Sequence, residues 1–126
     1  MVCIDSDVLI DFMNNKKDAV EKMLKLRKQD VSLSTTSINS FELLNGANIV
    51  KIDSIKNFIS NFSVHSFDLK SSEIASKIFQ NLKSSGEIIE IPDIMIASIC
   101  ISKGESLLTR NLSHFGRIPE LKIEKI

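Results

Sequence analysis

Short apolar runs alternate along the chain with longer amphipathic stretches. The runs that predict strands lie at residues 2–5, 31–35, 63–67, 106–108 and 121–124. Between these runs, apolar residues recur at the spacing of one helix face. Strands that alternate with helices favour a parallel sheet with helices on both of its faces, and the length of the chain favours one domain over residues 1–126.

The ends of two predicted helices are clearly marked. Asp68 starts a helix with a single apolar stripe, and Ser84-Ser85-Gly86 ends that helix. Pro92 and Asp93 open a second helix, which continues to Gly104. Because this second helix is apolar nearly all round, we expect it to be buried in the centre of the molecule.

Two further helix starts are less regular. Asp7 is expected to cap a short helix that begins after the first strand. Asn39, followed by Glu42 three residues later, resembles a capping box and predicts a helix that starts there and runs through Val50. Gly46 inside that helix is costly compared with alanine, unless it marks close packing.

Composition narrows the class of protein. The chain has 126 residues, 43% of them hydrophobic, and its net charge is zero, so no overall basic field indicates nucleic-acid binding. Cys3 and Cys100 lie in apolar runs, which favours buried free thiols and a reducing compartment. No segment resembles a signal peptide or is long enough to span a membrane. We therefore expect a cytoplasmic protein.

Four polar residues stand at the boundaries of predicted elements. Asp5 and Asn111 follow strands, and Glu42 and Asp93 lie in the first turns of helices. In an open parallel sheet, the carboxyl ends of strands and the amino ends of the following helices share one edge. We therefore expect all four side chains to line one crevice.

Three carboxylates close together repel one another, and a shared divalent cation relieves the repulsion. Oxygen ligands without a cysteine or a histidine pair favour Mg²⁺ or Mn²⁺. Such an ion can hold a phosphodiester and activate water. Taken singly, Glu42 and Asp93 are explained as well by helix capping, and Asn111 by a turn. Asp5, at a buried strand end, has no capping function of its own in this interpretation.

Four segments resemble the ordered motifs of PIN-domain ribonucleases, with the closest match to the VapC-type toxins of toxin–antitoxin pairs. The segments are Ile4–Ile10, Asn39–Ala47, Pro92–Ser98 and Leu108–Phe115. The resemblance implies a three-layer α/β/α fold with a five-stranded parallel sheet. It also implies an endoribonuclease that depends on Mg²⁺ or Mn²⁺.

The resemblance also implies roles for individual residues. Asp5, Glu42 and Asp93 match the invariant acidic positions of the family, where they act as metal ligands and catalytic groups. Asn111 matches a fourth position that is Asp or Asn, and here it removes one charge, which weakens a second metal site. Ser6 and Thr109 match supporting hydroxyl positions. Family members commonly form homodimers and are inhibited by a small antitoxin.

Two alternatives remain open at this stage. Asp5-Ser6-Asp7-Val8 also fits the opening pattern of haloacid-dehalogenase-like phosphotransferases, although Asp93 lacks the acidic neighbour that this family needs. A PIN-like module without activity is the non-enzymatic alternative. The other polar residues have simpler interpretations: Asp11 as a solvated side chain, His65 as a packed or surface histidine, and His114 as a turn residue.

Overall fold

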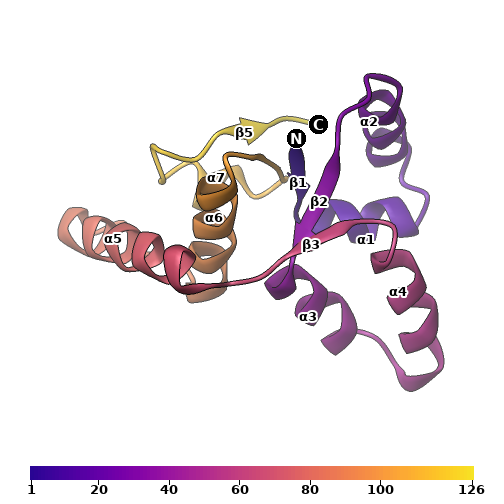
Figure 1. The fold of residues 1–126 in the computed structure, drawn as a ribbon, viewed down its shortest axis with the longest axis horizontal. Coiled ribbons are helices and arrows are strands. Elements are labelled where there is room, and N and C mark those ends of the chain that lie inside the picture. Colours follow the sequence, from indigo (N-terminus) through magenta and orange to yellow (C-terminus); the bar gives the residue numbers. More distant parts are fainter.

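A computed structural model, which describes all of residues 1–126, contains a five-stranded parallel sheet (Figure 1). Its strands are β1 (Val2–Ile4), β2 (Leu33–Thr36), β3 (Ser63–His65), β4 (Ser106–Leu108) and β5 (Ile123–Glu124). They lie in the order β3-β2-β1-β4-β5, and every neighbouring pair is parallel. The predicted parallel sheet is confirmed, with β1 at its centre.

Helices cover both faces of the sheet. They are α1 (Ser6–Met13), α2 (Lys17–Lys28), α3 (Ser37–Asn45), α4 (Ile52–Ile59), α5 (Leu69–Ser85), α6 (Ile91–Lys103) and α7 (Leu112–Phe115), with the short 3₁₀ helix η1 (Ile49–Lys51) before α4. In Figure 1, α5, α6 and α7 lie on one side of the strands and α1 to α4 on the other. The predicted three-layer α/β/α fold is therefore confirmed.

Alternation along β1 divides the core into two clusters. Cys3 faces one side and packs in a cluster with residues of α5 and α6, whereas Val2 and Ile4 face the other and pack with residues of α1 and α2. Helix α6 supplies Ile96 and Ile99 with no exposed surface, so the prediction of a central helix is confirmed. Both cysteines are buried and free, also as predicted.

Two predicted helix starts were wrong, because each strand passes directly into its helix. Asp5, not Asp7, is the N-cap of α1, and its Oδ1 accepts a hydrogen bond from the Ser6 amide at 2.9 Å. Helix α3 begins at Ser37, where the hydroxyl of Thr36 accepts from the Asn39 amide at 3.1 Å. The earlier start places Glu42 in the second turn of α3, whereas Asp93 lies in the first turn of α6 as predicted.

The predicted helix through Val50 was also wrong. Helix α3 ends at Asn45, and the amide of Gly46 donates to the Glu42 carbonyl as the C-cap. A Cβ at Gly46 would lie 3.4 Å from that same carbonyl oxygen, so the close approach expected of this glycine occurs at the end of the helix. The predicted ends at Gly86 and Gly104 are confirmed, and both glycines have positive φ. No helix of the structure has the length and apolar character needed to cross a membrane.

Candidate active site

One chain of hydrogen bonds and close polar contacts at the carboxyl edge of the sheet joins the four residues singled out in the sequence. Asp5 and Asn111 follow β1 and β4, while Glu42 and Asp93 come from α3 and α6. The links between them are Ser6, Asn39, Thr109 and His114. The structure thus brings all four predicted residues into one polar network, as well as the two predicted supporting hydroxyls.

Asp5 is the buried centre of this network. Only 7% of the residue is exposed, and each carboxylate oxygen is bonded. Oδ1 accepts from the Ser6 amide at 2.9 Å and from Asn39 Nδ2 at 2.8 Å, and Oδ2 accepts from the Thr109 hydroxyl at 2.7 Å. Burial, and then the nearby charge of Asp7, raise the pKa of Asp5 to about 7, although the hydrogen bonds act in the opposite direction.

Asn39 connects Asp5 with Glu42. Its side chain is fully buried, and Nδ2 donates to Ser6 Oγ at 2.8 Å as well as to Asp5. The Ser6 hydroxyl in turn donates to Glu42 Oε1 at 2.7 Å. From the sequence, Asn39 is expected only to cap a helix. The available signal was its spacing: Asn39 lies one turn before the buried Leu43, so it is a polar residue on the core-facing side of α3.

Replacing Asn39 with alanine is expected to lower the free energy of unfolding by about 1–3 kcal/mol, because Asp5, Ser6 and Thr36 each lose a buried hydrogen-bond partner. Urea unfolding would measure the loss. Asn57→Ala is the matched control, since Asn57 is an exposed asparagine within α4 and its replacement should stay within about 0.5 kcal/mol. Equal unfolding energies for the two variants would contradict the structural role of Asn39.

The segment after β4 completes the network. The amide of Asn111 donates to Thr109 Oγ1 at 3.0 Å, and its side-chain Nδ2 lies 3.1 Å from His114 Nδ1. The same ring nitrogen lies 2.8 Å from Asp93 Oδ2. The prediction that His114 is a turn residue was therefore wrong: it belongs to α7 and contacts a predicted site residue. The bond to Asp93 spans 21 positions, so no local pattern could reveal it.

Hydrogen bonds of Asp7 and Arg110 connect the segment after β4 to α1 and α2. Asp7 accepts from the Val8 amide at 2.7 Å through Oδ1 and from the Arg110 amide at 3.0 Å through Oδ2. The Arg110 guanidinium bonds Asp11 at 2.6 Å and both carboxylate oxygens of Asp18. The prediction that Asp11 is a solvated side chain was therefore wrong, because Asp11 forms an ion pair with Arg110. Through its bonds to the Val8 and Arg110 amides, Asp7 links the start of α1 to the segment after β4.

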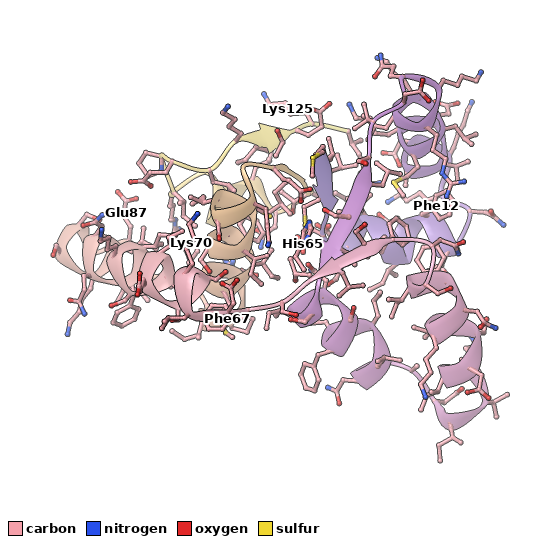
Figure 2. All side chains as sticks on the ribbon, in the orientation of Figure 1. Phe12, His65, Phe67, Lys70, Glu87 and Lys125 are labelled. Carbon is pink, nitrogen blue, oxygen red and sulfur yellow. The ribbon has the colours of Figure 1, made fainter.

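A second buried polar cluster lies on the sheet and is separate from this network. Figure 2 labels His65, at the end of β3. His65 Nε2 lies 2.9 Å from Oε2 of Glu105, whose side chain is 1% exposed. Ser34 in β2 donates to the same oxygen at 2.7 Å. These contacts confirm the interpretation of His65 as a packed histidine.

The chemistry of the donors fits a hard divalent cation. Asp5, Glu42 and Asp93 offer carboxylate oxygens at one edge of the sheet, and Glu42 and Asp93 each use only one oxygen, Oε1 and Oδ2, in the network. No three His, Cys, Asp or Glu side chains gather closely enough to hold an ion by themselves. Mg²⁺ ordinarily takes one or two carboxylates and keeps several waters, so this arrangement suits it.

Comparison with known proteins gives consistent matches. The protein-family model for the PIN domain matches residues 2–121 of this chain. Ribonuclease VapC3 of Methanocaldococcus jannaschii is 36% identical over 96 residues, 76% of this chain and 94% of the relative. The tRNA(fMet)-specific endonuclease VapC of Salmonella typhimurium is 28% identical over 96% of this chain and 94% of its own. The solved structure of DNA-bound VapBC from Salmonella typhimurium matches with a TM-score of 0.86 and 26% identity, over 98% of this chain and 96% of that chain.

Proposed function

The chain belongs to the PIN-domain family, and from that premise we propose that it is a metal-dependent endoribonuclease and the toxin of a toxin–antitoxin pair. The family resemblance of the four sequence segments is confirmed by this membership. The observation that carries the proposal is the network of hydrogen bonds and close polar contacts that joins Asp5, Glu42, Asp93 and Asn111 at one edge of the sheet. Residues 1–126 would form one PIN-like domain.

The proposed reaction is hydrolysis of an RNA phosphodiester bond. Asp5 and Asp93 would hold Mg²⁺ or Mn²⁺, which when bound neutralises the phosphate and activates water. Glu42 would orient the attacking water and receive its proton at Oε2, the oxygen that Ser6 does not occupy. Asn111 would support the substrate phosphate, and Ser6 and Thr109 would keep Glu42 and Asp5 in place through their hydroxyl groups.

Substrate and partners are proposed from the relatives. PIN-domain ribonucleases generally depend on divalent metal ions. The matched relatives are named as ribonucleases, one of them specific for tRNA(fMet), and the solved neighbours include complexes of toxin with antitoxin. For this chain we propose an RNA substrate, a small antitoxin protein, a homodimer and a cytoplasmic location.

The phosphotransferase alternative loses its main support in the structure. That scheme uses Asp5 as nucleophile and Asp7 as a free acid two residues later. Here both oxygens of Asp7 accept backbone amides, from Val8 and Arg110. The Asp5-Ser6-Asp7 pattern is therefore explained by the start of α1 and its attachment to the segment after β4.

Cleavage of a mixed pool of structured and single-stranded RNAs tests the proposal. We expect the purified protein to cut RNA with Mn²⁺ or Mg²⁺ and to stop when EDTA removes the ion, because the carboxylates alone cannot neutralise a phosphodiester. Undiminished cleavage in EDTA would contradict a metal-dependent mechanism. Absence of cleavage together with absence of saturable Mn²⁺ binding would instead indicate a module without activity.

A further inference from the structure

His114 has no assigned part in the proposed reaction, yet it lies between two of the proposed site residues. Its Nδ1 is 2.8 Å from Asp93 Oδ2 and 3.1 Å from Asn111 Nδ2. The side chain of His114 is 33% exposed and that of Asp93 is 14% exposed, so water competes only partly for this contact.

We propose that His114 is a positioning residue, which holds the Asp93 carboxylate in the orientation that binds the metal ion; the inference rests on the proposed function. Asp93 uses Oδ2 for the ring, so the bond directs its other oxygen, Oδ1, away from His114. A carboxylate held at one oxygen loses rotational freedom before the ion arrives, and the ion then binds a ligand that is already oriented.

The direction of the hydrogen bond follows from the chemistry of the two groups. A carboxylate oxygen accepts, so the ring must donate from Nδ1. Donation by Asn111 to the same nitrogen would require Nδ1 to accept, and the two contacts therefore favour opposite tautomers of the ring. The bond to Asp93 is the shorter one and is assisted by the charge of the carboxylate, so it selects the tautomer with hydrogen on Nδ1.

The short helix α7 holds His114 in place. Phe115, the next residue, has no exposed surface and packs in the same core cluster as Ile94, the residue after Asp93. A Cβ at Gly116 would lie 2.5 Å from the Leu112 carbonyl oxygen, so glycine allows the tight end of α7. His114 and Asp93 therefore project from neighbouring points of one rigid core.

Loss of a hydrogen-bond partner of a metal ligand typically lowers metal affinity about 10–100-fold. We expect His114→Ala to weaken Mn²⁺ binding at least about tenfold, as measured by the paramagnetic resonance of free Mn²⁺ during titration. His114→Asn places an amide N–H near the position of Nδ1 and should retain most of the affinity. His114→Gln places its amide near the position of Nε2 instead and should behave like the alanine variant.

Leu112→Ala is the matched control, because Leu112 is an exposed residue of the same helix, and it should bind Mn²⁺ like the wild type. Cleavage by His114→Ala should recover most of the wild-type rate at saturating Mn²⁺, since the defect lies in metal affinity. Wild-type Mn²⁺ affinity in His114→Ala, or an equal loss in His114→Asn, would overturn the proposal. So would lost cleavage at saturating Mn²⁺ with unchanged affinity, which would indicate direct participation in the reaction.

The two proposals fail in different ways. If the wild type neither binds Mn²⁺ nor cleaves RNA, the proposed function itself is wrong. If the wild type does both and the His114 variants bind Mn²⁺ as tightly, only the positioning role is wrong.

Discussion

Asp93→Asn is expected to lower metal-dependent RNA cleavage about a thousandfold, the scale on which the loss of one charge-stabilising group acts in other active sites. The substitution keeps the size of the side chain and removes its charge. An asparagine Oδ1 can still accept from His114 Nδ1 in place of the carboxylate oxygen. The expected loss is therefore one of charge at the metal, not of folding.

Initial rates on a cleaved RNA, with wild type and variant purified side by side, would measure this effect. Asp53→Asn is the matched control, because it makes the same change at an exposed residue in the first turn of α4. It should leave cleavage unchanged. If Asp93→Asn cleaves at more than half of the wild-type rate and EDTA stops this cleavage, the assignment of Asp93 is wrong. If EDTA does not stop the cleavage, the preparation contains a contaminating ribonuclease.

Asp5→Asn is expected to produce the second large effect, a gain in stability that depends on pH when metal is absent. Burial and the charge of Asp7 raise the pKa of Asp5 from 3.8 to about 7. The folded protein therefore holds a proton that the unfolded chain releases near pH 4. As pH rises from about 4 to about 7, ionisation of the buried carboxyl progressively destabilises the folded state, by about 4 kcal/mol in the limit.

Asparagine at position 5 cannot ionise. In the wild type the Thr109 hydroxyl donates to Asp5 Oδ2, and in the variant the asparagine Nδ2 can donate to Thr109 Oγ1 instead. In EDTA, the variant should be more stable than the wild type at pH 8, and its advantage should grow by about 2–3 kcal/mol between pH 5 and pH 8. Urea unfolding at both pH values would measure this difference. The comparison with the wild type cancels the titrating groups that do not interact with Asp5.

Metal should stabilise the wild type and have little effect on Asp5→Asn. In the proposed site Mg²⁺ would bind the ionised carboxylate of the wild type, so it should raise the unfolding energy at pH 8, while Asp5→Asn should respond weakly. The same variant should also lose cleavage. Parallel stability curves for wild type and variant between pH 5 and pH 8 would show that Asp5 ionises normally in the folded protein.

The layout of strands and helices could be predicted because it depends on short-range periodicity. The strand positions, the central apolar α6 and the glycine-capped ends of α5 and α6 all follow from residues close together in sequence. The starts of α1 and α3 were missed because the caps lie at the strand ends: Asp5 directly follows β1 and Thr36 is the last residue of β2. The pair Asn39 and Glu42 offered a plausible local alternative three residues later.

The candidate site was predicted in part. Positions at strand ends and helix starts were enough to select Asp5, Glu42, Asp93 and Asn111, whose catalytic roles stay predictions. Asn39 and His114 were assigned to a cap and a turn, since their partners lie 34 and 21 residues away. Local spacing places Asn39 on the core-facing side of α3, but it does not show which distant residues these two side chains bond.

By itself, the sequence determined the class of fold, the parallel order of alternating strands and helices, and the edge at which acidic residues collect. Those properties depend on which residues are apolar and how they are spaced. Only the tertiary structure decided which hydrogen bonds each carboxylate makes, that Asp7 bonds two backbone amides, and that Arg110 pairs with Asp11 and Asp18. The bond from Thr109 to Asp5 spans 104 positions, and side chains that far apart are brought together only by the packed layers of the fold.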